Sequence, residues 1–141
     1  MSRVINRDTE GNQRDRLLKM ASAALGEFFK SPQPGEKSRD QAAFVALALM
    51  EVDKTIEPSA QAWEKRGYWV KADRYRLDWE WTARLGKRLA EELQADHWDG
   101  VQQTMVEAAQ HLATVRASTT MIKKEPWKGS WEQLSAVWGA D

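Results

Sequence analysis

The chain has 141 residues, of which 42% are hydrophobic and 30% charged; its 21 basic and 21 acidic residues cancel, and it contains no cysteine. This length and composition are those of one soluble globular domain. Zero net charge argues against a protein that coats nucleic acid over its whole surface, and the lack of cysteine excludes disulfides, thiolate metal sites and cysteine nucleophiles. No signal peptide or membrane span is recognisable, because the longest apolar run covers only residues 42–50. We therefore expect a soluble, cytoplasmic protein.

The first helix is predicted over residues 13–30, where apolar residues recur at steps of three and four. Asn12 is placed to cap it, because its side chain can accept a hydrogen bond from a free backbone amide of the first turn. Two prolines and a glycine end the pattern within residues 31–37. Ser38 and Gln41 have the spacing of a capping box, which predicts the start of a second helix.

The second helix is apolar nearly all round from residue 42 to residue 50, so we expect it to be the most buried one. Pro58 and Gly67 then offer two places where a helix can bend or end. We favour a kinked helix over residues 39–66. The alternative is one uninterrupted helix over residues 58–94, which would be about 55 Å long at 1.5 Å per residue.

The third helix, predicted over residues 69–94, carries two apolar stripes on opposite faces, whereas a surface helix usually has one. The first stripe consists of Val70, Leu77, Trp81, Leu85 and Leu89, and we expect it to build the core. The second stripe consists of Ala72, Tyr75, Trp79, Ala83, Gly86, Ala90 and Leu93. Its small residues leave room for another helix to approach closely, so both faces are predicted to need cover.

A fourth helix is predicted over residues 97–117, with Asp96 as its cap and an antiparallel arrangement beside the third helix, because the loop before it is short. Ser130 and Gln133 form another candidate capping box, which predicts a short terminal helix. No strand pattern is present. The predicted fold class is all-α, an up-down four-helix bundle over residues 13–122, with a flexible N-terminus at residues 1–12 and a C-terminal segment at residues 123–141 that carries the short helix.

The sequence offers no catalytic constellation. His97 and His111 lie fourteen residues apart on one predicted helix, about 21 Å along its axis, so they cannot share a metal ion. Glu107 with His111 is a single, unrepeated pair, whereas carboxylate-bridged metal sites in bundles need such pairs on facing helices. We predict no catalytic residue, no metal site and no cofactor, and keep a metal-dependent helical-bundle enzyme as a third hypothesis.

The strongest functional signal is the segment of residues 63–88, which holds six aromatic and eight basic residues. Our first hypothesis is a non-enzymatic interaction module that binds a protein partner or a second copy of itself, because Trp, Tyr and Arg dominate interface energetics. The candidate contact residues are Trp69, Tyr75, Trp79 and Gly86. In the competing, structural interpretation, the terminal helix covers the second stripe within the same chain, using Trp127, Trp131 and Trp138.

The second hypothesis is a nucleic-acid surface, on which basic side chains contact phosphates while aromatic rings stack on unpaired bases. Its candidate residues are Arg74, Arg76, Arg84, Lys87 and Arg88. In size and expected fold alone, the chain resembles the small all-helical subunits of ribonucleoprotein effector complexes, including those of CRISPR systems, and this resemblance implies a subunit that lines a nucleic-acid path. Residues 89–115, with five acidic residues and no Lys or Arg, would then have to face elsewhere.

Overall fold

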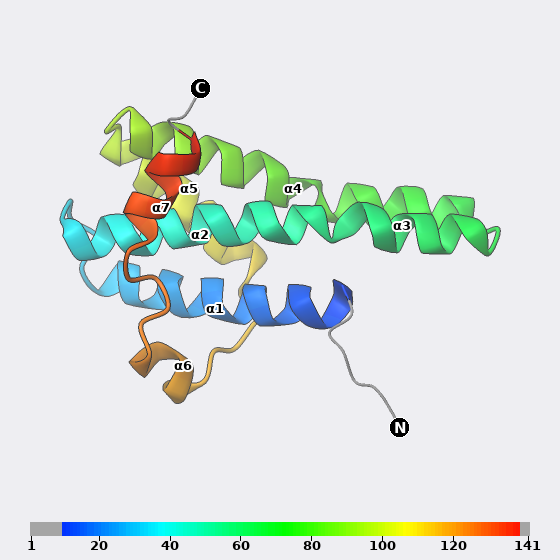
Figure 1. Cartoon of the computed structure of the whole chain (residues 1–141), viewed down its shortest axis with the longest axis horizontal. Coiled ribbons are helices and arrows are strands. Elements are labelled where there is room, and N and C mark those ends of the chain that lie inside the picture. Colours follow the sequence, from blue (N-terminus) through cyan, green and yellow to red (C-terminus); the bar gives the residue numbers. More distant parts are fainter. Residues whose placement is uncertain (1–9, 139–141) are drawn as a thin grey trace.

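The structure, a computed structural model, describes residues 10–138, and within them seven helices and no strand are found (Figure 1). The helices are α1 (Glu10–Lys30), α2 (Glu36–Lys54), α3 (Ile56–Lys65), α4 (Trp69–Gln94), α5 (Trp98–His111), α6 (Thr119–Lys123) and α7 (Ser130–Trp138). α3 continues the line of α2, and the long helices run side by side as a bundle. The predicted all-α bundle with a short C-terminal helix is confirmed.

The first two helices start earlier than predicted. α1 already includes Glu10, so Asn12 lies inside the helix, while residues 1–9 of the N-terminus predicted to be flexible lie outside the described residues. α2 begins at Glu36, and no side chain caps it. The Ser38 hydroxyl donates instead to the Gln33 carbonyl oxygen at 2.6 Å. Ser38 therefore fastens the preceding loop, and the predicted capping box is wrong.

The long second helix breaks at Thr55, three residues before Pro58. The Thr55 backbone N–H donates to the Val52 carbonyl oxygen at 2.9 Å, and the Thr55 hydroxyl donates to the same oxygen at 2.6 Å. This hydrogen bond spans three residues, so it closes a tighter turn than the four-residue hydrogen bonds of an α-helix. Pro58 falls in the first turn of α3, where its missing N–H is tolerated. The kinked helix is thus divided into α2 and α3, and the alternative of one helix over residues 58–94 is wrong.

Both ends of α4, whose predicted bounds are confirmed, are set by a residue in the left-handed conformation. Gly67 has φ 86°, and the next residue, Tyr68, donates its N–H to the Trp63 carbonyl oxygen at 3.0 Å, which folds α4 back along α3. Asp96 has φ 55°, a conformation that Asp tolerates better than most residues. Asp96 therefore ends α4 and does not cap α5; its carboxylate pairs with Arg39 at 2.8 Å.

α5 ends at His111, six residues before the predicted end of the fourth helix. The chain then crosses α1, where the Ser22 hydroxyl donates to the Val115 carbonyl oxygen at 3.0 Å. Ser118 starts a new helix, α6, by accepting the Met121 backbone N–H at 3.1 Å. A serine in this position favours a new helix start because it satisfies a free amide. α5 consequently covers less of α4 than predicted.

The terminal helix α7 is capped by a different helix. Ser130 is its first residue and is buried, so Ser130 does not act as the predicted cap. The Asp40 carboxylate of α2 accepts the backbone N–H groups of Gly129 at 3.2 Å and Trp131 at 2.9 Å. A carboxylate at a helix N-terminus both satisfies free amides and complements the helix dipole. Asp40 therefore fixes α7 against α2.

The core is centred on α2, the helix predicted to be most buried. α4 approaches it closely at Gly86: a Cβ there would lie 3.1 Å from Met50 Cγ, 3.3 Å from the Ala46 carbonyl oxygen and 3.3 Å from Leu49 Cβ. Gly86 is thus enclosed between two helices of this chain. Its prediction as a partner-binding residue is wrong, because Gly86, like Ala72 and Ala90 of the same stripe, is buried and serves internal packing.

We expect Gly86→Val to lower the free energy of unfolding by about 1–3 kcal/mol, because the added methyl groups must displace Met50 or the α2 backbone. Denaturant unfolding measures this. Gly26→Ala in α1 is the matched control: apart from its chain neighbours and its own helix backbone, no heavy atom of the described residues lies within 4 Å of its Cβ position. Alanine also favours a helix over glycine by about 0.5–1 kcal/mol. An unchanged unfolding free energy for Gly86→Val would contradict the close contact.

Asp40→Ala should lower the free energy of unfolding by about 0.5–2 kcal/mol, the usual effect of losing a helix cap, and should speed amide exchange in α7. Asp53→Ala changes an exposed carboxylate of the same helix and should alter stability by no more than about 0.5 kcal/mol. Equal effects of the two substitutions would show that Asp40 does not hold α7.

Candidate functional site

The first stripe of α4 is covered only in part. The hairpin of α3 and α4 extends past the N-terminal end of α1 (Figure 1), and α5 ends where the His111 ring stacks on Trp81, with centroids 4.2 Å apart. Leu85 is fully buried, whereas Val70 and Leu77 are each 74% exposed. The prediction that the whole stripe builds the core is wrong for Val70 and Leu77, because α5 does not reach them.

The second stripe is covered within the chain except at Ala83, which is exposed. The Arg14 guanidinium of α1 lies 5.5 Å from the Tyr75 ring centroid and 5.3 Å from the Trp79 ring centroid, and it donates to the Thr55 hydroxyl at 3.0 Å. Both rings are half-buried against the core. α7 packs mainly on α2 and reaches α4 only at its C-terminal end, where Gln94 donates to the Ser135 hydroxyl at 3.3 Å. The alternative in which the terminal helix covers this stripe is therefore wrong for Tyr75 and Trp79. Tyr75 and Trp79 offer only part of their surface to a partner.

Four exposed apolar side chains gather where the hairpin turns into α4. Tyr68 is 52% and Trp69 61% exposed, and together with Val70 and Leu77 we call them the hairpin patch. Lys71 and Arg74 line the same shallow hollow as the first three. The Lys71 ammonium lies 5.7 Å from the Tyr68 ring centroid, a cation–π contact. Of the candidate contact residues, Trp69 is the one that stands fully at the surface.

Arg76 is not available to an external anion, because it joins the two helices of the hairpin. Its guanidinium contacts Glu57 at 2.8 Å, Glu64 at 2.8 Å and Asp73 at 3.2 Å. The hydrogen bonds that Arg76 donates hold the pKa of the Glu57 carboxyl below its ordinary value, and the Glu57 and Glu64 carboxylates that accept them raise the pKa of Arg76. The cluster links α3 to α4 and leaves no surplus positive charge.

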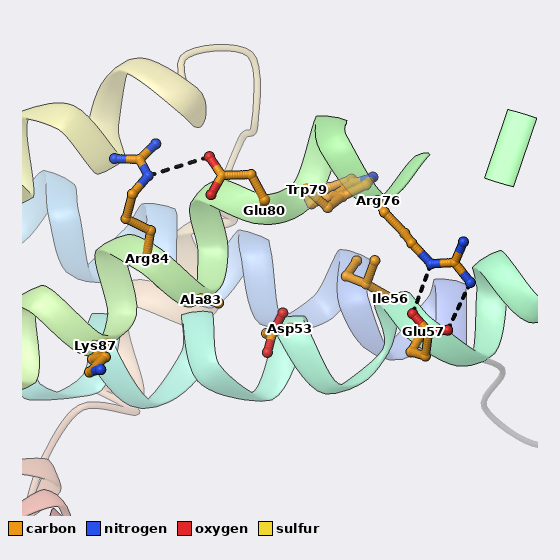
Figure 2. A pocket seen from close by; sticks show the side chains of 9 residues that line it. All are labelled: Asp53, Ile56, Glu57, Arg76, Trp79, Glu80, Ala83, Arg84 and Lys87. Atoms are coloured by element: carbon orange, nitrogen blue, oxygen red, sulfur yellow. Dashed lines mark hydrogen bonds and ion pairs between the residues drawn. The ribbon is translucent and has the colours of Figure 1, made fainter. Parts of the chain in front are cut away.

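Figure 2 shows a pocket of ≈ 630 Å³ between α4 and the junction of α2 with α3. Three of the five residues predicted for nucleic acid line it with three carboxylates, so it has no net charge: Arg76, Arg84 and Lys87 with Asp53, Glu57 and Glu80. Arg84 donates to Glu80 at 3.3 Å. Arg88 faces α5, where it pairs with Glu107 at 2.7 Å, and Arg74 belongs to the hairpin patch region. The five basic residues therefore form no continuous basic surface.

The two histidines lie at opposite ends of α5. Within residues 10–138, no three His, Asp or Glu side chains are grouped closely enough to hold a metal ion. None of the helices in that same range combines the length and apolarity that a membrane crossing requires. Comparison of the chain with protein families, with curated proteins and with solved structures gave no match.

The sequence singled out the helix that carries the exposed apolar side chains, but not every one of those side chains. Val70 and Leu77 were assigned to the core, and Tyr68 was not singled out. Val70 and Leu77 are exposed because α5 ends before it reaches them. In the sequence, the sign of that end is Ser118, which starts the next helix, α6. Arg14 gave no recognisable signal, because its contact with the aromatic pair joins segments about sixty residues apart.

Arg76→Gln should raise the pKa of Glu57 toward its ordinary value, which carboxyl NMR titration measures; Arg84→Gln, which lies outside the cluster, should leave it unchanged. Since the folded pKa of Glu57 lies below the unfolded one, the ion pair stabilises the fold above the ordinary glutamate pKa, and this contribution is lost as pH falls through the lowered value. The stability difference between wild type and Arg76→Gln should therefore shrink in acid. A constant difference at all pH values would contradict the linkage.

Proposed function

We propose that this protein is a non-enzymatic helical interaction module that binds a protein partner through the hairpin patch. The observation that carries the proposal is the exposure of Val70 and Leu77, each 74%, on the same stripe of α4 that forms the core further along. A stripe with helical spacing and apolar character is suited to packing against another helix. The chain itself supplies that helix, α5, only as far as Trp81.

The composition of the hairpin patch supports the same proposal. Tyr68 and Trp69 present large rings with few rotatable bonds, and such residues contribute much of the binding energy at interfaces. Lys71 and Arg74 stand beside them and form no ion pair with the described residues. An apolar centre with a charged rim is the usual anatomy of a protein interface.

A nucleic-acid backbone is the second candidate, and one observation favours it: exposed Tyr68 and Trp69 stand next to the uncompensated Lys71 and Arg74. Bases stack on such rings. The candidate is weaker because Arg76, Arg84 and Arg88 all pair with carboxylates of the chain. Lys87 lies in the neutral pocket, so only Arg74 of the five predicted residues borders the hairpin patch.

Leu77→Ser and Trp69→Ala should each reduce the amount of protein partner that co-purifies with the chain from its own cells by about tenfold or more. Burial of one large apolar side chain is worth about 1.5–3 kcal/mol, and 1.4 kcal/mol corresponds to tenfold in affinity. Mass spectrometry of the co-purified material measures this. Thermal unfolding in a dilute sample should be unchanged, because both side chains are mostly exposed within one copy of the chain.

Val137→Ser is the matched control, since Val137 is 64% exposed on α7, away from the hairpin. It should leave the co-purified partner in place. If Leu77→Ser retained every partner, the hairpin patch would not be the binding surface. If the chain instead binds an oligonucleotide, and if this binding weakens steeply with added salt and with Arg74→Ala, the nucleic-acid candidate is favoured.

A further inference from the structure

The exposed face of α4 carries two pairs of residues with the same spacing. Val70 and Leu77 are the apolar pair, seven residues apart and each 74% exposed. Lys71 and Asp78 are an oppositely charged pair, also seven residues apart, both exposed, on the adjacent flank of the helix. Seven residues make almost two helical turns, so each pair keeps its side of α4. The face therefore carries Val70 and Leu77 with the charged Asp73 and Arg74 between them, and it changes sign along one flank.

We propose that the occupant of the hairpin patch is a second copy of this chain, bound through its own α4 in antiparallel orientation about a two-fold axis; this rests on the proposed function. Isologous two-fold dimers are the commonest oligomers, because one self-complementary surface is enough to make them. An axis between positions 73 and 74 brings Val70 of one copy opposite Leu77 of the other, and Leu77 opposite Val70. The four side chains then cover one another.

The same axis satisfies the charged flank. Because Lys71 and Asp78 have the spacing of the apolar pair, the register that joins Val70 to Leu77 also brings Lys71 of each copy beside Asp78 of the other. Neither Lys71 nor Asp78 has an acidic or basic partner among the described residues. Opposite charges across a helix pair stabilise it and like charges destabilise it. The same register therefore covers the apolar pair and brings the opposite charges together.

Near the axis, the two-fold brings Arg74 of each copy beside Arg74 of the other on one flank, and Asp73 beside Asp73 on the opposite flank. The Asp73 carboxylate is 75% exposed and contacts Arg76 at 3.2 Å, so an oxygen remains accessible to a second guanidinium. Each Arg74 side chain is long enough to reach across the axis to this Asp73 oxygen of the other copy, which offsets the repulsion between the two guanidiniums. A face suited to an acidic partner or to nucleic acid would instead carry one sign of charge throughout. The alternation of Lys71, Asp73, Arg74 and Asp78 favours self-association.

Cysteine crosslinking tests the register, and the natural chain contains no cysteine to interfere. Val70→Cys mixed with size-tagged Leu77→Cys should form a mixed disulfide under mild oxidation. Neither variant alone should crosslink, because in this register two copies of position 70, or of position 77, lie about 10 Å apart along the axis, beyond the usual disulfide reach. Crosslinks of each variant with itself, or none in the mixture, would overturn the register.

Sedimentation measures the association itself. The wild type should be a dimer and Leu77→Asp a monomer with unchanged helicity. Asp78→Lys should weaken dimerisation about tenfold, since two exposed charge pairs are each worth up to about 1 kcal/mol, and Lys71→Asp combined with it should restore the dimer. A wild type that stays monomeric at its highest soluble concentration, a Leu77→Asp variant that stays dimeric, or a dimer that nuclease dissolves would each overturn the inference. A monomeric wild type whose partner capture still depends on Leu77 would leave the proposed function standing.

Discussion

The surface chemistry of this protein depends on a difference in length between two neighbouring helices. α4 has 26 residues and α5, which packs antiparallel beside it, has 14. The apolar stripe of α4 therefore continues beyond its cover, and Val70 and Leu77 remain at the surface. Apolar side chains in such a continuous stripe gain free energy only when another surface removes them from water. The exposure of this place is a direct consequence of how far α5 extends.

The opposite face of α4 shows the same residue types in a structural role. Tyr75 and Trp79 lie under the Arg14 guanidinium, and Gly86 lets the helix rest directly on α2. Arg76 binds carboxylates of both helices of the hairpin. These contacts hold α3 against α4, so the hairpin patch is presented on a packed support. Some aromatic and basic residues of this short segment thus hold the hairpin together, whereas others are exposed at its end.

Helical periodicity predicted the fold class, the bounds of α4 and the burial of α2, because these depend on patterns within one segment. The predicted caps failed for a common reason: Asn12, Ser38, Asp96 and Ser130 have the right residue types, but tertiary contacts or backbone geometry decide where each helix begins. Asp40, which caps α7 from ninety residues away, has no local signal. Likewise, which residues of α4 are exposed follows from the end of a different helix, and a single-segment pattern cannot contain that information.

Within residues 10–138, no element covers the end of the α4 stripe. A soluble paramagnetic probe in NMR tests it most directly, because the probe broadens the signals of methyl groups that solvent can reach. In a dilute sample, the account predicts strong broadening for Val70 and Leu77 and none for Leu85 and Leu89, which lie under α5 in the same stripe. Protection of Val70 and Leu77 at dilution, to the level of Leu85, would contradict the account.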